Sequence, residues 1–200
     1  GHWPVRPRFK PLGDGSPMTR IKTIPSIADA PEAARPLLED AKKKLGSVPN
    51  LFRVIANSPA ALEGYLGVIE ALSKGSLDPK THERIALAVA EINGCSYCLS
   101  AHSYLARHVA KLDDAELTAN RNGSSNDPKA EAAVRFAAAV VRERGHVSDA
   151  DVAAVKAAGF DDAELVEIVL HVALNTLTNY VNEVALTEID FPAVTPRKAA

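Results

Sequence analysis

The stretch LDPKTHERIALAVAEINGCSYCLSAH, residues 77–102, contains the signals that decide the fold. Asp78 followed by Pro79 is a typical helix start, because aspartate caps free backbone N–H groups and proline fits the first helical position. Gly94 marks the end of this helix, since glycine readily takes the left-handed conformation found there. Apolar residues recur between these signals at helical spacing. We therefore predict one helix from Pro79 to just before Gly94, and a second that begins near Cys95.

Helical patterns also dominate the chain on both sides of this stretch. Alanine and leucine are abundant, and no segment shows the sustained alternation typical of strands. Further helices are expected at about residues 31–45, 59–74, 128–144, 148–157 and 161–185, with shorter ones within 48–59 and 113–121, and the helix from Cys95 is expected to run to about Leu112. The fold class predicted is all-α.

The chain divides into one domain with two flanking segments. Residues 1–17, GHWPVRPRFKPLGDGSP, are rich in proline and glycine and resemble an expression leader, so the natural protein is expected to start at Met18. Residues 18–192 are expected to form a single helical domain, because a chain of 200 residues suits one domain with a substantial core. Residues 193–200 are expected to be a C-terminal tail.

Composition excludes several classes of function. The 23 Lys and Arg residues against 25 Asp and Glu residues leave a net charge of -2, so no positive excess exists to hold nucleic acid or anionic lipid. No apolar run approaches the roughly 20 residues that span a bilayer. We expect neither nucleic acid nor a membrane as partner.

The two cysteines of the chain, Cys95 and Cys98, lie three residues apart. Two cysteines cannot form the framework of a small disulfide-rich domain, and no signal peptide is visible at the start. The cytoplasm is therefore the expected compartment. In that reducing environment a close cysteine pair is typical of redox chemistry or metal binding.

Cys98 and His102 are four residues apart, so a helix places them on one face. A thiol has an unperturbed pKa of about 8.5, and a neighbouring imidazole together with a helix N-terminus favours its thiolate. Cys95, one turn earlier, is positioned either as a resolving thiol or as a nucleophile itself.

Three other interpretations of these residues remain open. The cysteines can be small apolar core residues. Zinc can take Cys95, Cys98 and His102, with Glu83 or His108 as fourth ligand, although the chain has no second ligand cluster. A thioredoxin-type site uses the same cysteine spacing, but it belongs at the end of a strand, and no strands are visible.

The opening stretch resembles the superfamily of alkylhydroperoxidase AhpD and carboxymuconolactone decarboxylase. The resemblance depends on a glutamate in one helix and on two cysteines and a histidine leading into the next. It extends over most of residues 18–192, where VPNLFRVIANSP and LNTLTNYVNEVALTEIDFP are similar to the branch called peroxidase-related proteins.

The resemblance implies an AhpD-like helical bundle, assembly into homotrimers or hexamers, and thiol-dependent reduction of hydroperoxides without a cofactor or metal. It implies that Cys98 is the peroxidatic cysteine, that Cys95 resolves it, and that Glu83 and His102 relay protons. An external dithiol reductant, of lipoyl or thioredoxin-like type, is then required. The main alternative is a redox-sensing or oligomeric binding protein with a regulatory disulfide.

One position departs from the best-characterised alkylhydroperoxidases. They carry a histidine between the two cysteines, where this chain has Tyr97. Tyrosine has an unperturbed pKa of about 10, so it cannot replace histidine as a base near neutrality. The departure indicates a weaker relay or a different substrate.

Other polar and aromatic residues are weaker candidates. His171, Asn175 and Asn179 recur every four residues as a polar stripe, for which a satisfied hydrogen-bond network is favoured over a role in lining a pocket. His82 is expected at the surface and His108 too far from Cys98 to matter. Tyr65 and Tyr180 are expected to serve in packing.

Overall fold

The computed structural model of the chain describes residues 19–197. The leader predicted for residues 1–17 and the last three residues of the predicted tail lie outside the described residues. Within the described part the chain contains helices and no strands, as the sequence predicts. The principal helices are α1 Arg35–Leu45, α2 Asn50–Ile55, α3 Pro59–Leu72, α4 Pro79–Asn93, α5 Ser96–His108, α6 Asp114–Arg121, α7 Pro128–Arg142, α8 Asp149–Ala157 and α9 Asp162–Ala185.

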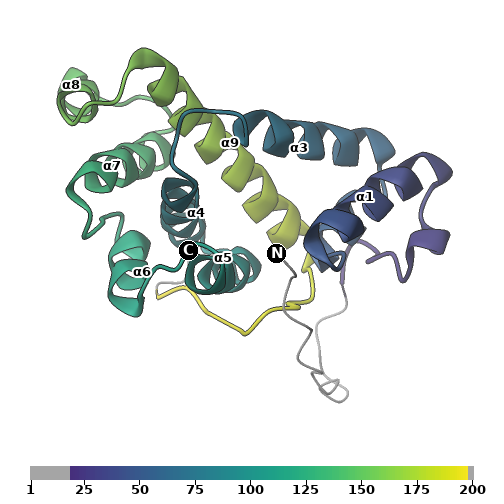
Figure 1. Ribbon diagram of the computed structural model, residues 1–200. Coiled ribbons are helices and arrows are strands. Elements are labelled where there is room, and N and C mark those ends of the chain that lie inside the picture. Colours follow the sequence, from purple (N-terminus) through teal and green to yellow (C-terminus); the bar gives the residue numbers. More distant parts are fainter. Residues whose placement is uncertain (1–18, 198–200) are drawn as a thin grey trace.

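Helix α4 begins and ends where its sequence signals place it. The Asp78 carboxylate accepts a hydrogen bond from the N–H of Lys80, Pro79 occupies the first turn, and Gly94 closes the helix with φ +72°. The helix is buried on almost every side, because it contacts α5, α6, α7 and α9. α4 is therefore the central element of the fold (Figure 1).

Helix α5 is shorter than predicted. It ends at His108 rather than near Leu112. Lys111 takes the left-handed conformation with φ +57°, and the N–H of Leu112 returns to the carbonyl of Ala106. This closure ends the helix without a glycine, which explains why the sequence did not reveal the end.

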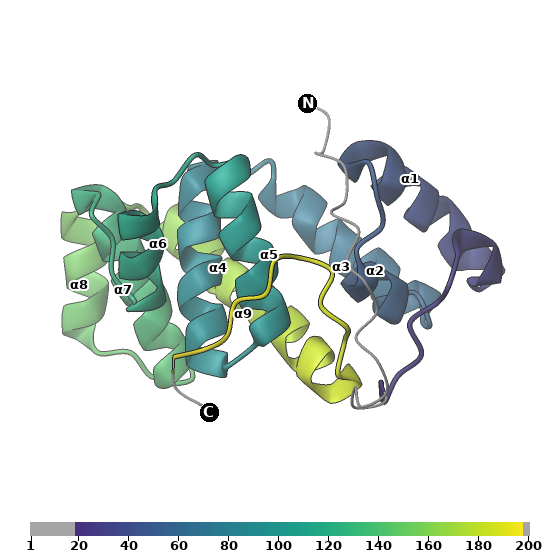
Figure 2. The ribbon, with the colours of Figure 1, turned by 90° about the horizontal axis from the view of Figure 1, so that it is seen from below.

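The long helix α9 connects two groups of helices. Helices α7 and α8 lie at one side of α4, whereas α1, α2 and α3 lie beyond α5 and the C-terminal half of α9 (Figures 1 and 2). Glu167 on α9 holds the loop before α4, because its carboxylate accepts the N–H groups of Ser76 and Leu77. A side chain at Gly75 would collide with this carboxylate, with a distance of 2.6 Å from an added Cβ.

After α9 the chain runs as an extended arm across α5 (Figure 2). The N–H of Val194 donates to the hydroxyl of Ser100 at 2.8 Å, and the N–H of Arg197 donates to Glu91 at 2.6 Å. The arm therefore docks on the helices that carry the cysteine motif. None of the helices within residues 19–197 has the length and apolarity needed to cross a membrane.

Candidate active site

The junction between α4 and α5 brings the two cysteines together. Cys95 is the N-cap of α5, and its sulfur accepts a hydrogen bond from the backbone N–H of Cys98 at 3.2 Å. This cap folds the chain so that the two sulfur atoms lie 2.7 Å apart as free thiols. A disulfide between them requires only a small further approach.

The two sulfurs differ in access. Cys98 is 3% exposed and lines a cavity, whereas Cys95 is fully buried and is not part of the cavity lining. Cys98 also lies in the first turn of α5, where the helix dipole favours a negative charge. A molecule in the cavity therefore meets Cys98 before Cys95.

The environment of Cys98 favours its thiolate. Burial by itself would raise the pKa of this thiol, but hydrogen bonds from Cys95 and Asn182 and the charge of His102 outweigh burial and lower the pKa to about 7. The pKa of Cys95 is raised, first because its thiol donates to Cys98 and then because it is buried. Of the two thiols, Cys98 is therefore the one that ionises first.

His102 forms an ion pair with Glu83 beside the cysteines. Its Nδ1 lies 2.9 Å from a Glu83 carboxylate oxygen, and the histidine side chain is 23% exposed. Burial opposes the charged imidazolium, yet the charge and hydrogen bond of Glu83 and the charge of Cys98 raise the pKa of His102. The structure thus brings the four predicted site residues together: Glu83, Cys95, Cys98 and His102.

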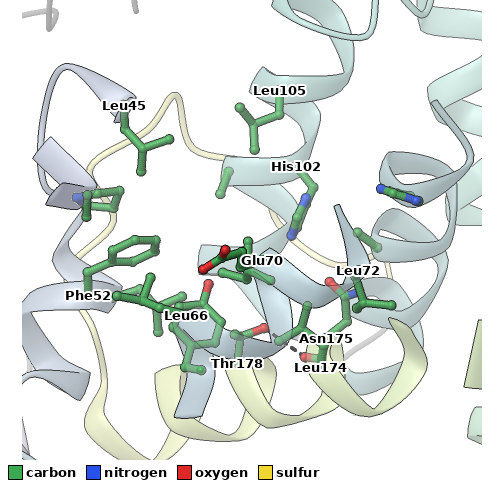
Figure 3. Close-up of a pocket in the computed structure, with 18 of the residues that line it drawn as sticks. Leu45, Phe52, Leu66, Glu70, Leu72, His102, Leu105, Leu174, Asn175 and Thr178 are labelled. Carbon is green, nitrogen blue, oxygen red and sulfur yellow. Dashed lines mark hydrogen bonds between the residues drawn. The ribbon is translucent and has the colours of Figure 1, made fainter. Parts of the chain in front are cut away.

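Cys98 and His102 border a cavity of about 850 Å³. It lies between α1–α3 on one side and α4, α5 and α9 on the other. In the close-up, Phe52 and Leu66 lie on one side of the cavity and His102 and Asn175 on the other (Figure 3). Most of the lining is apolar, so the cavity suits an organic molecule with a small reactive group.

Charged residues at the cavity are mainly acidic. The lining includes the exposed carboxylates of Asp40, Glu63 and Glu70 and the ammonium of Lys44. Lys44 pairs with Asp40 at 2.9 Å, and Glu70 pairs with Lys74 at 3.0 Å. With the ammonium of Lys44 engaged, the entrance offers little attraction to an anion.

Tyr97 has a structural role at this site. Its hydroxyl donates to Asp190 at 2.7 Å and accepts the N–H of Leu51 at 3.1 Å, so it joins the C-terminal arm to α2. Burial, followed by the charge of Asp190, raises the pKa of Tyr97 well above its usual value. The phenol therefore stays protonated and does not act as the base that the family's second histidine would supply.

The polar stripe on α9 is only partly a satisfied network. Asn179 accepts a hydrogen bond from Asn93 at 2.9 Å, and Asn175 donates to the backbone of α9. Within residues 19–197, however, His171 Nε2 and Asn179 Nδ2 have no hydrogen-bond partner. His171 and Asn175 line the cavity, so the alternative that the sequence ranked lower holds for these two residues.

Two residues were misplaced or missed by the sequence analysis. His82 is half-buried instead of exposed, and its ring packs on that of His171 with centroids 4.1 Å apart. The reason is that α4 has neighbours on nearly every side, which cover part of its flanks. Asn182, which contacts Cys98, was not singled out, although it extends the polar stripe by one helical turn beyond Asn179.

His108, Tyr65 and Tyr180 differ in how they are placed relative to the cavity. His108 is exposed, packs on Tyr104 and lies outside the cavity lining, as expected. Tyr65 is buried against Phe52 and contributes to the cavity wall, whereas Tyr180 is exposed on α9 rather than packed within the domain.

The structure does not assemble a zinc site from the predicted residues. Across residues 19–197, no group of three or more histidine, cysteine, aspartate or glutamate side chains is arranged to hold a metal ion. His102 Nδ1 is engaged by Glu83. The zinc interpretation of the cysteine motif therefore gains no support.

Part of the chain matches a known family model, and the fold is similar to that of several solved structures. Residues 59–139 match the model of the Carboxymuconolactone decarboxylase family. The chain is similar to a peroxidase-related protein with an alkylhydroperoxidase AhpD core from Ralstonia eutropha JMP134, with a TM-score of 0.76 and 25% identity over 88% of this chain and 94% of that one. A peroxidase-related protein from Silicibacter sp. TM1040 gives a TM-score of 0.74 and 24% identity over 90% and 95% of the two chains.

A third solved structure with a similar fold is named for a different activity. It is the debrominase Bmp8 in complex with 2,3,4-tribromopyrrole, with a TM-score of 0.71 and 18% identity over 86% of this chain and 93% of that one. No curated protein matches the chain in sequence. The family model and the peroxidase-related structures confirm the resemblance seen in the cysteine motif. The chain has an all-α, AhpD-like fold, and its residues 59–139 match the Carboxymuconolactone decarboxylase family model.

Proposed function

We propose that this protein is a thiol-dependent peroxidase that reduces organic hydroperoxides. The observation that carries the proposal is the arrangement at the start of α5. There the cavity-facing sulfur of Cys98 lies 2.7 Å from the sulfur of Cys95 and has its pKa lowered to about 7, next to the His102–Glu83 pair. Activated thiolates of this kind are found at catalytic sites.

The first step oxidises Cys98 and reduces the peroxide. The thiolate attacks the outer oxygen of R–O–O–H, the O–O bond breaks, and Cys98 becomes a sulfenic acid. The departing alkoxide takes a proton from the His102 imidazolium and leaves as the alcohol R–OH. Glu83 keeps His102 protonated for this role, in agreement with the raised pKa of the imidazole.

The second step converts the sulfenic acid of Cys98 to a disulfide. The Cys95 sulfur attacks the Cys98 sulfenic acid, a disulfide forms, and the hydroxyl leaves with the Cys95 proton as water. An external dithiol of lipoyl or thioredoxin-like type then exchanges with this disulfide and is itself oxidised. Because such a cycle needs reduced thiols at rest, we also propose the cytoplasm as its compartment.

The cavity supports an uncharged organic hydroperoxide as substrate. Its apolar walls accommodate a hydrocarbon body, while the acidic residues at its edge disfavour an anionic group. A substrate panel should contain hydrogen peroxide, cumene hydroperoxide, a fatty acid hydroperoxide and, because a debrominase shares the fold, 2,3,4-tribromopyrrole.

We propose that copies of the chain associate through the outer face of α9. This face carries large apolar side chains that are 39% to 69% exposed, at positions Val166, Val169, Leu170, Leu177, Tyr180 and Val184. Their spacing forms one continuous stripe along the helix, and a stripe of this length on a single element matches another copy of the same stripe. The assembly that the resemblance implies is a homotrimer or hexamer.

This association can be tested with Leu177→Arg, which places a charge in the middle of the stripe. The variant is expected to sediment as a monomer at concentrations at which the unmodified protein is an oligomer, because an unpaired charge is costly in an interface. Val109→Arg is a matched control, since Val109 is also exposed but lies at the end of α5. A monomeric unmodified protein would contradict the proposal.

The proposed reaction is tested by peroxide consumption with dithiothreitol as reductant. Cys98→Ser is expected to lose all reduction of peroxide. Cys95→Ser, assayed without dithiothreitol, is expected to reduce one equivalent and to accumulate a trappable sulfenic acid. The reverse result would exchange the roles of the two cysteines. If the unmodified protein forms the disulfide reversibly but consumes no peroxide catalytically, a redox-sensing role replaces the peroxidase proposal.

A further inference from the structure

Asn182 is a buried residue of α9 that contacts the proposed reactive sulfur. It is 3% exposed, and its Nδ2 donates to the Cys98 sulfur at 3.3 Å. Its Oδ1 has no hydrogen-bond partner within the described part of the chain. The contact with sulfur is thus the hydrogen bond that the structure gives this buried side chain.

A buried amide gains little from a neutral thiol and much more from a thiolate. Sulfur in a thiol is a weak acceptor, whereas hydrogen bonds to an ionised acceptor are about twice as strong as neutral ones. An amide left half satisfied in an apolar interior is unfavourable. The position of Asn182 is therefore best explained if Cys98 is charged. The N–H group of Asn182 then stabilises the Cys98 thiolate.

A second asparagine lies one helical turn earlier on the same helix. Asn179 is fully buried, and its Oδ1 accepts from Asn93 Nδ2 on α4. This bond determines the orientation of the Asn179 amide, whose Nδ2 remains without a partner among the described residues. Both Asn182 and Asn179 lower the pKa of Cys98, the first more than the second.

We propose that Asn182 is a further catalytic residue, which holds Cys98 as a thiolate through a direct hydrogen bond to its sulfur. Helix α9 then supplies the thiolate with an amide donor in addition to the thiol of Cys95. The inference rests on the proposed function for the choice of Cys98 as the reacting atom. Its test measures the thiolate directly, so it does not depend on peroxide turnover.

The test is the pH dependence of Cys98 alkylation by iodoacetamide in a Cys95→Ser background, where a single thiol reacts. Asn182→Leu keeps approximately the size of the side chain and removes the amide, with its N–H donors and its carbonyl acceptor. We expect the midpoint of the alkylation profile to move upward by about one pH unit, which is about a tenfold loss of thiolate below the midpoint. Asn182→Asp replaces the donor with a negative charge and is expected to shift the midpoint further.

Asn120→Leu is the matched control. Asn120 is fully buried on α6 and bonds to Glu116, but it does not line the cavity. Its replacement is expected to lower stability and to leave the alkylation midpoint where it was. Circular dichroism establishes whether each variant is folded, and Asn182→Asp serves as the test if Asn182→Leu does not fold.

The possible outcomes separate this inference from the peroxidase proposal. An upward midpoint in both Asn182 variants supports the role of Asn182 even if the unmodified protein consumes no peroxide, in which case only the peroxidase proposal fails. Unchanged midpoints in folded Asn182 variants overturn the inference, even if the unmodified protein is an active peroxidase. Equal shifts in Asn120→Leu and Asn182→Leu would also overturn it, because the shift would then come from a general loss of packing in the protein.

Discussion

The protein has two interiors that differ in packing, although they share the helices α4 and α9. One interior, between α4, α7, α8 and α9, is filled by apolar side chains, including Ile85, Val89, Ile168 and Val172. The other, between α1, α2, α3 and α5 and the remaining faces of α4 and α9, contains the cavity and the cysteines. The first supports the fold, and the second leaves space for a ligand.

The contrast shows how one helix can serve both purposes. On α4, Ile85 and Val89 face the filled interior, while Glu83 lies at the cavity. On α9, Ile168 lies in the filled interior, whereas the later turns carry the polar residues next to Cys98. Rigid packing of one part of each helix holds the functional groups of the other part at defined positions.

The largest expected effect distinguishes the two interiors by stability. Ile168→Ala creates a void in the filled interior and should lower the free energy of unfolding by about 3 kcal/mol. Leu174→Ala only enlarges a cavity that already exists, so it should cost roughly 1 kcal/mol or less. Denaturant unfolding at one fixed protein concentration measures both. Equal losses would show that the second interior is as tightly packed as the first.

A second, smaller effect concerns the charge on Cys98. His102→Gln removes the imidazolium that helps to lower the pKa of Cys98 to about 7, so this pKa should rise. Thiolate forms as the pH rises through the pKa, so alkylation at pH 7 should slow by about tenfold for each unit of increase. The two proteins should react alike at high pH, where both are ionised.

His108→Gln is the control for this experiment. His108 lies on the same helix but is exposed and outside the cavity lining, so its replacement should leave the alkylation profile unchanged. A profile that does not move in His102→Gln would show that the Glu83–His102 pair has no influence on the sulfur.

The smallest expected effect tests whether the Tyr97 hydroxyl only holds the C-terminal arm or also acts on the Cys98 thiol. Tyr97→Phe keeps the ring but removes the hydroxyl that joins Leu51 and Asp190, and it should lower the free energy of unfolding by about 1 kcal/mol. The alkylation midpoint of Cys98 should stay the same, because the phenol is not a base. His108→Gln, at an exposed position outside the cavity lining, should change neither quantity. A shift of the midpoint in Tyr97→Phe would instead assign the phenol to the relay.

Much of the fold was predictable because its signals are local. Asp78, Pro79 and Gly94 delimit α4 through capping and backbone preferences that depend on adjacent residues only. The end of α5 was predicted too late, because Lys111 adopts a left-handed conformation that its type does not announce. His82 was placed at the surface because a spacing rule describes one helix and not its neighbours.

The sequence by itself determined most of the helices and the cluster of two cysteines with a histidine one turn away, because capping and helical spacing act over a few residues. Only the tertiary structure decided which sulfur faces the cavity, that Glu83 reaches His102 at 2.9 Å, that Tyr97 holds the C-terminal arm, and that Asn182 contacts Cys98. Asn182 lies 84 positions from Cys98 in the chain. Contacts over such separations depend on how whole helices pack, which no local pattern encodes.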